Sequence, residues 1–250
     1  MSVISHSNST TFVSSEESRA VRIAAYFTMA VTAFYPLLFI GAGFLTILLT
    51  GDIGIPDLST RAGLAYAGRF PTAVTIGSLA DGFSHVVFFV TFVAVFAVLR
   101  RSFPVRATLI LVCAAWQLVV GVSKALTSVY IITSLGTLYL ATPLSGRGAF
   151  LPVGTLAQGL RQGLQDMDTY GVIAIWLLVA LLPAATGMPG LVRWLGVAMA
   201  VAILQPWWDL GFPLALLLAA VWAILLGLWL KRQAVTSSAT PVSTAVATPS

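Results

Sequence analysis

The sequence predicts an all-α, polytopic integral membrane protein, built as a bundle of six transmembrane helices. Only 8% of the 250 residues are charged and 58% are hydrophobic, whereas soluble domains carry about a quarter charged residues. The mean hydropathy is +0.97. Several apolar segments also approach the roughly 20 residues that a helix needs to cross a bilayer. Composition and segment length therefore indicate the same fold class.

The expected spans follow one another along the chain at about 23–49, 71–99, 105–132, 170–186 and 191–204, with a last one that ends near 230. The first is too long for the core of a signal peptide and follows a polar tail. The sequence QPWWD at 205–209 favours a turn at the membrane surface, because proline lacks a backbone donor and tryptophan prefers the interface. Since the fifth span is short, five helices is the alternative.

Six spans bring both termini to one side of the membrane, and the basic residues support this topology. Eight of them fall on the side of the termini: Arg19, Arg22, Arg100, Arg101, Arg106, Arg193, Lys231 and Arg232. Four fall on the opposite side: Arg61, Arg69, Arg147 and Arg161. Because cytoplasmic loops carry an excess of Lys and Arg, we expect a multi-pass protein of the cell membrane with both termini in the cytoplasm.

The predicted domain organisation has a membrane bundle at 22–232 between two polar tails. The tails, 1–21 and 233–250, are rich in Ser and Thr and are expected to be disordered and cytoplasmic. The longest connection is an outer loop at 133–168, which is rich in glycine and proline. Its last part, TLAQGLRQGLQDMD (155–168), is expected to form a short amphipathic helix at the outer surface.

Short motifs along the chain resemble a bacterial membrane protein family. They are Arg22-Ile23-Ala24-Ala25-Tyr26 at the first span, Gly77 with Asp81 in the second, LRRSFPVR after it, and Gly187-Met188-Pro189 followed by Arg193-Trp194-Leu195-Gly196. Together they are similar to six-span proteins catalogued as domain of unknown function 4386 (DUF4386), over most of 22–230. The resemblance implies the six-span fold and carries no activity. Thr75 and Gln117 depart from it, because such proteins tend to have arginine in the second and third spans.

Residue counts exclude several enzyme classes and cofactor sites. Glu17 is the last glutamate and His85 is the only histidine in an expected span, so the helical zinc-protease motif and multi-histidine metal sites are absent. No glycine-rich loop adjoins a lysine with serine or threonine, so no nucleotide site is expected. The net charge of +5 is explained by cytoplasmic loops. We therefore expect no cofactor, no metal and no nucleic-acid partner.

Polar residues at membrane depth form the candidate site. Asp81 and His85 lie four residues apart in the second span and so share a helix face. The other members are Gln117 and Lys124 in the third span, Asp168 at the start of the fourth, and Trp208 and Asp209 in the last turn. The topology places all but the deeper Gln117 in or near the outer half of the membrane. Intramembrane ionisable residues commonly mark function. The simpler roles are a neutral His85 bonded to a carbonyl and a Trp208 that anchors its helix at the interface.

Three functions are compatible with these residues. The first, which we prefer, is a non-enzymatic binder or carrier of a small or lipid-like molecule, with membrane lipid and a small hydrophobic ligand as partners. The second is an intramembrane enzyme acting on a lipid or isoprenoid, with Asp81 as general acid and His85 as base. The third is a structural or accessory subunit whose polar residues lock helix packing. The sequence leaves open whether the protein is an enzyme and what its oligomeric state is.

A buried aspartate needs a partner, and the sequence predicts Lys124 as the partner of Asp81. Asp81 lies about ten residues, or ~15 Å, from the outer end of the second span, and Lys124 lies about eight residues, or ~12 Å, from the same end of the third. A short basic turn joins the two spans, so they are expected to pack antiparallel. Asp168 and Arg69 are the alternative partners.

Overall fold

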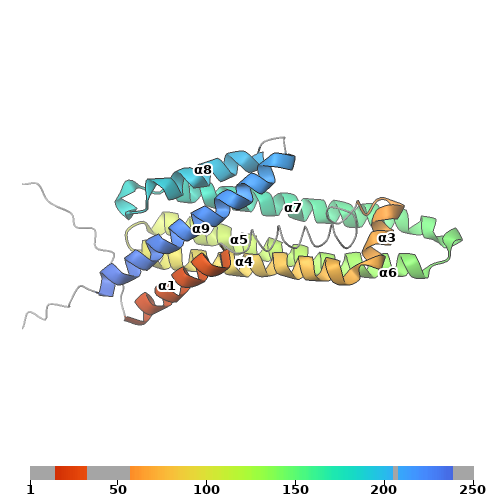
Figure 1. Cartoon of the computed structure of the whole chain (residues 1–250), viewed down its shortest axis with the longest axis horizontal. Helices are drawn as coiled ribbons and strands as arrows, with labels where there is room; N and C mark the ends of the chain where they lie inside the picture. The colour runs from red at the N-terminus through yellow and green to blue at the C-terminus, as the bar shows by residue number, and fades with distance from the viewer. Residues whose placement is uncertain (1–14, 33–56, 205–207, 239–250) are drawn as a thin grey trace, which may run out of the picture.

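The computed structural model describes residues 15–32, 57–204 and 208–238, which are predominantly helical and contain no β-strand (Figure 1). The predicted all-α fold class is therefore confirmed. The α-helices are α1 (Ser15–Phe27), α3 (Arg61–Arg69), α4 (Pro71–Leu99), α5 (Pro104–Leu126), α6 (Thr133–Ala141), α7 (Phe150–Ala180), α8 (Gly190–Leu204) and α9 (Trp208–Ser238). Short π-helical turns, η1 (Thr28–Thr32) and η2 (Thr127–Ile132), follow α1 and α5, and 3-10 turns, η3 (Leu144–Ala149) and η4 (Ala184–Thr186), flank α7.

The helices pack as neighbours in the order α1, α9, α8, α7, α5 and α4, and α4 also contacts α1, so the bundle closes on itself. The run from α5 through η2 into α6 is continuous over Pro104–Ala141, or 38 residues. At 1.5 Å per residue this run is about 57 Å long. It therefore extends well past α8 and α9 along the long axis of the molecule (Figure 1).

Within the described residues, three helices are long and apolar enough to cross a membrane: Pro71–Leu99, Pro104–Ala141 and Leu217–Val235. Helix α8 is apolar and shorter, with 15 residues. These helices support a membrane protein, and the count of six spans remains a prediction. Most of the expected first span (33–49) and the expected break at 205–207 lie outside the residues that the structure describes.

Basic side chains hold one end of the bundle together. Arg100 donates to the carboxylate of Glu17 at 2.7 Å, which joins the end of α4 to the start of α1. Arg106 and Arg193 each donate, at 3.2 Å, to a carbonyl just past the end of α7. A cation at a helix C-terminus also interacts favourably with the helix dipole. The residues predicted to face the cytoplasm therefore gather at one end of the molecule, where α1 begins and α9 ends (Figure 1).

The predicted outer loop at 133–168 is wrong, because this segment is helical nearly throughout. It forms α6, η3 and the first part of α7, and 155–168 lies inside α7 instead of forming a separate helix. Two of its glycines are packing positions, not turns. A Cβ on Gly136 would lie 2.4 Å from the backbone nitrogen of Gly68, and one on Gly154 would lie 2.2 Å from the Leu58 carbonyl oxygen. Glycine here lets backbones approach closely.

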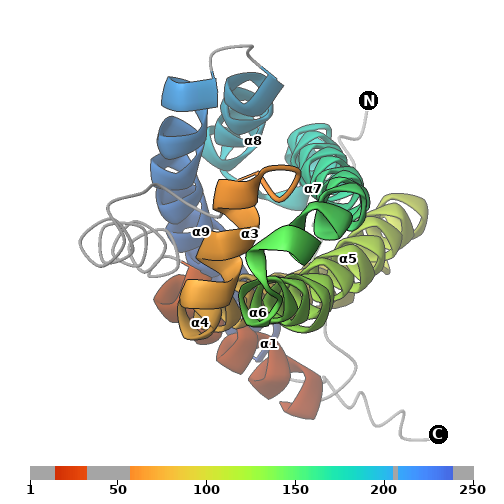
Figure 2. The same cartoon turned by 90° about the vertical axis from the view of Figure 1, so that its right-hand side faces the viewer.

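These segments build a cap, residues 57–70 and 132–157, with a hydrophobic core of its own. That core contains Leu58, Leu64, Tyr66, Ala67, Ile132, Leu135, Tyr139 and Ala157 of the cap, together with Val74 of α4. Helix α3 packs against α6, and both lie at the near end in the view along the long axis (Figure 2). The cap therefore covers the end of the bundle opposite the basic residues.

The predicted tails are also shorter than expected, since helix covers 15–21 and 233–238. These turns are held by packing between α1 and α9. Val21 and Ala234 are buried in the same cluster, and the Ser18 hydroxyl donates to the Ala234 carbonyl oxygen at 2.7 Å. The low apolar content of each tail gives no indication that the two tails pack against each other. The remaining tail residues lie outside the described part of the chain.

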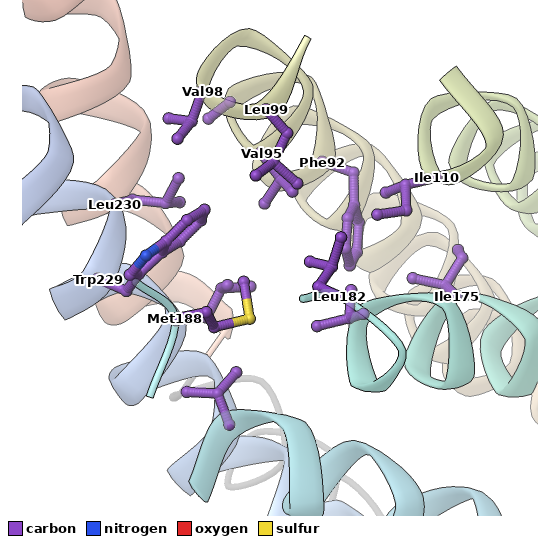
Figure 3. Packing of buried hydrophobic residues seen from close by; sticks show 14 of the residues in the cluster. Phe92, Val95, Val98, Leu99, Ile110, Ile175, Leu182, Met188, Trp229 and Leu230 are labelled. Atoms are coloured by element: carbon purple, nitrogen blue, oxygen red, sulfur yellow. The ribbon is translucent and has the colours of Figure 1, made fainter. Parts of the chain in front are cut away.

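The main hydrophobic core lies between the basic end and the middle of the bundle. Phe92 and Leu99 of α4, Ile110 of α5, Ile175 of α7 and Trp229 of α9 converge there (Figure 3). The indole N–H groups of Trp222 and Trp229 each donate to a backbone carbonyl oxygen, at 3.0 and 3.4 Å. The indole N–H of Trp176, in the same core, has no hydrogen-bond partner among the described residues. The interval between this core and the cap core contains the polar residues.

Candidate functional site

The register of α4 against α5 sets the position of the site. A Cβ on Gly82 would lie 2.8 Å from that of Ala125, and a Cβ on Gly121 would overlap the ring of His85, at 2.2 Å. As one helix is followed forward, its contacts move backward along the other, so the pair is antiparallel as predicted. One end of this interface joins the cap core and the other joins the main core. The polar residues therefore lie in one layer with apolar packing on both sides.

The predicted pairing of Asp81 with Lys124 is confirmed. Lys124 Nζ lies 2.9 Å from Asp81 Oδ2. The lysine is only 8% exposed, and the aspartate side chain is 25% exposed. An ammonium and a carboxylate at this distance compensate each other's loss of hydration. The contact joins the two helices within the polar layer.

Asp168 of α7 is the central acceptor of the layer and is 6% exposed. Its Oδ2 accepts from Lys124 Nζ, and its Oδ1 accepts from Gln117 Nε2. His85 Nε2 lies 2.8 Å from the same Oδ1. Asp168 therefore receives groups from both α4 and α5. The sequence placed it in the site as a reserve partner for Asp81, whereas the structure connects the two carboxylates through the ammonium of Lys124.

The ammonium of Lys124 has a third oxygen near it. Gln165 Oε1, one turn before Asp168 on α7, lies 3.3 Å from Nζ. An ammonium group has three N–H donors and no acceptor. Asp81, Asp168 and Gln165 thus supply one oxygen for each donor. We call these three oxygens the ammonium cradle.

The hydrogen bonds of His85 fix where its protons lie. Nδ1 is 2.8 Å from the backbone carbonyl oxygen of Asp81. A carbonyl only accepts, so Nδ1 carries a hydrogen and donates it. Nε2 faces Asp168 Oδ1, and an ionised carboxylate also only accepts. That second contact therefore contains a proton too, carried either by the ring or by the carboxyl group.

This proton makes the layer electrically neutral. Asp81 and Asp168 contribute two negative charges and Lys124 one positive charge. A protonated His85 supplies the second positive charge, and a proton on Asp168 instead removes one negative charge. Either placement gives a net charge of zero, which is the arrangement that burial in an apolar bundle favours. Loss of the shared proton would leave one uncompensated negative charge.

Two glycines, Gly121 and Gly171, give the polar side chains their space. Besides the His85 ring against Gly121, Gln117 Oε1 would lie 2.1 Å from a Cβ on Gly171. That oxygen has no hydrogen-bond partner among the described residues. Sequence analysis missed both glycines, although Gly121 and Ala125 have the four-residue spacing of small residues typical of membrane helix interfaces. Gly77, in contrast, has no described atom near its missing Cβ.

The structure brings together five of the seven predicted site residues: Asp81, His85, Gln117, Lys124 and Asp168. The side chains of Trp208 and Asp209 lie outside the described part of the chain, so their predicted place in the site stays a prediction. Arg69, the other alternative partner for Asp81, belongs to the short helix α3 in the cap.

The depth of the layer follows from helix lengths. His85 lies 14 residues before Leu99, or about 21 Å along α4 from the basic end. Asp168 lies 12 residues before Ala180, or about 18 Å along α7 from the same end. A bilayer core is about 30 Å thick. If the basic end lies at one membrane surface, the layer falls in the half of the membrane away from it.

Comparison with known proteins gives no relative for this chain. No family model, no curated protein and no solved structure matches it. The resemblance to DUF4386 therefore remains a prediction. The arrangement of the site itself is what bears on function.

The Asp81–Lys124 contact makes a prediction for stability. Lys124→Met leaves two buried carboxylates with one shared proton, so we expect it to destabilise the protein by about 3–5 kcal/mol. Adding Asp81→Asn restores neutrality and should recover much of that loss. Thermal or denaturant unfolding of the two single variants and the double variant in detergent measures this coupling. Lys231→Met, the chain's other lysine, is the matched control and should cost much less. Strictly additive effects would contradict the pairing.

Proposed function

We propose that this protein is a multi-pass cell-membrane protein that binds or carries a small molecule without enzymatic activity, and that the polar layer is its proton-handling site. The observation that carries the proposal is the 2.8 Å contact between His85 Nε2 and Asp168 Oδ1 in a buried layer, from which we infer the shared proton. Since the layer is neutral only while it holds that proton, a charged solute that binds there favours proton exchange. Histidine is the side chain best suited to this exchange near neutral pH.

The energetic cost of the layer favours a role beyond packing. Burying four ionisable groups is commonly no more stabilising than an apolar layer of similar volume. The cores on both sides of the layer already pack α4, α5 and α7 through apolar side chains. Helix association does not require charges at this depth. The charged layer is therefore better explained by function than by assembly.

An enzymatic role for Asp81 is less favoured by the geometry. Lys124 lies 2.9 Å from its carboxylate, and an ion-paired aspartate holds no proton to donate as a general acid. His85 uses both ring nitrogens in contacts with Asp81 and Asp168. Neither residue of the proposed acid–base pair is thus left available for a lipid or isoprenoid substrate.

A structural lock is the second candidate, and one observation favours it. Asp81, Lys124, Asp168 and His85 are all paired with one another, with no partner missing. Such a closed set would hold three helices in one register. The two proposals differ in the expected effect of a substitution at His85. In a structural lock, the substitution changes only the stability of the protein.

The topology belongs to the proposal as well: six spans with both termini in the cytoplasm. It is supported by the basic residues at one end of the molecule and by the cap at the other. In a Cys113→Ser background, Gly148→Cys should react with an impermeant maleimide in intact cells, because Gly148 faces open space in η3. Ser102→Cys, in the basic turn between α4 and α5, should react only after lysis. The reverse pattern would contradict the orientation.

Proton coupling is tested in proteoliposomes that contain a pH-sensitive dye. Inward gradients of amines, carboxylates, amino acids and sugars are applied in turn, and we expect at least one class to change the internal pH. His85→Gln should abolish that change while the protein remains folded, because glutamine keeps hydrogen-bonding groups and does not titrate. His6→Gln, at the chain's other histidine, is the matched control. A stable His85→Gln variant with unchanged coupling would favour the structural lock.

A further inference from the structure

We propose that the ammonium cradle is a binding site for a primary ammonium group of the substrate, which takes the place of Lys124 in exchange for one proton. The inference rests on the proposed proton-coupled function and names its substrate class. Lys124 acts as a tethered ligand that occupies the site in the absence of substrate.

The chemistry of the cradle fits an ammonium group. Its oxygens come from Asp81, Asp168 and Gln165, and they meet Nζ from two different helices. Two of the oxygens are carboxylate oxygens, which balance a positive charge, and the third is a neutral amide oxygen. Three acceptors around one nitrogen match the three donors of R–NH₃⁺. A quaternary ammonium has the charge and lacks the donors, so it should not fit.

The geometry favours an ammonium over a metal ion. Among the residues that the structure describes, no three His, Cys, Asp or Glu side chains are grouped as a metal site. The Nζ–oxygen distances of 2.9 and 3.3 Å are those of N–H···O hydrogen bonds. The cradle therefore selects for hydrogen-bond donors.

Two hydroxyl groups lie on the cap side of the cradle. Ser78 lies one turn before Asp81 on α4, and Ser128 lies one turn after Lys124 in η2. The two serines are 9% and 5% exposed. Because the helices are antiparallel, both serines lie on the same side of the cradle. A polar molecule next to the cradle would therefore have two hydroxyl groups as hydrogen-bond partners.

The exchange balances in charge and in atoms. Lys124 loses one proton to water, so one N–H bond breaks and its amine becomes neutral. The substrate ammonium enters with one positive charge and donates to the oxygens that the lysine leaves. The proton between His85 and Asp168 stays in place during this step and compensates the second carboxylate, so the net charge of the layer remains zero. Coupling therefore needs His85 to keep the layer neutral, although the released proton comes from Lys124. No oxidant, reductant or covalent intermediate is needed.

The experiment measures proton release by the purified full-length protein in weakly buffered detergent solution. Ethylammonium chloride should release about one proton per chain in a saturable manner, by linkage between binding and protonation. Tetramethylammonium and sodium chloride at the same concentration should release none. Release by sodium or by tetramethylammonium to the same extent would overturn the assignment to a primary ammonium group.

A variant keeps the inference testable if Lys124 prevents ethylammonium from binding in the ammonium cradle. Lys124→Ala removes the tethered ammonium and opens the cradle, so ethylammonium should raise its Tm and release no proton. Lys231→Ala is the matched lysine variant and should show no such gain. Absence of ethylammonium stabilisation in a folded Lys124→Ala variant would overturn the inference.

The two experiments distinguish failure of the ammonium-site inference from failure of the proposed proton-coupled function. If carboxylates or sugars change the internal pH of proteoliposomes and ethylammonium releases no proton, the ammonium class is wrong and proton coupling stands. If no solute changes the internal pH while ethylammonium stabilises Lys124→Ala, the cradle exists and the carrier function is wrong.

Discussion

The rest of the site depends on the contacts that the carboxylate of Asp168 makes. It receives Lys124 and Gln117 from α5 and meets His85 of α4, while its own backbone belongs to α7. One side chain thus fixes the rotation of three helices about their axes. It also determines the charge of the layer, because the proton it shares with His85 balances its own negative charge beside the neutral Asp81–Lys124 ion pair. Without this carboxylate, Lys124 would keep only Asp81 as its anionic partner, and His85 Nε2 would lose its contact on α7.

The Asp81–Lys124 pairing could be predicted from sequence because it needs only depth and topology. Two spans joined by a short turn must be antiparallel, and counting residues places the two charges at the same level. Predicting the central position of Asp168 requires more information, because this position depends on how α7 is rotated against α5. That rotation follows from the close contacts of His85 with Gly121 and of Gln117 with Gly171. A single sequence does not say which glycine faces which side chain.

The cap was predicted wrongly for a similar reason: a single sequence does not show which segments its glycines contact. Its glycines suggested turns, and so a loop, because glycine favours both turns and close backbone contact. Gly136 against Gly68 is a contact of the second kind, and recognising it requires the partner segment. Helices α4 and α5, in contrast, begin at Pro71 and Pro104, within one residue of the starts expected at 71 and 105, and proline is favoured in the first turn of a helix.

The central claim is that a proton lies between His85 and Asp168 while Nδ1 of the same ring donates to a carbonyl. Nuclear magnetic resonance of ¹⁵N-histidine-labelled protein in a His6→Gln background observes this ring alone. Near neutral pH we expect an Nδ1-bound hydrogen and a second, strongly deshielded proton associated with Nε2. Gly121→Ala should remove the second signal, because the added Cβ displaces the ring. A ring with hydrogen on Nε2 and none on Nδ1 would contradict the account.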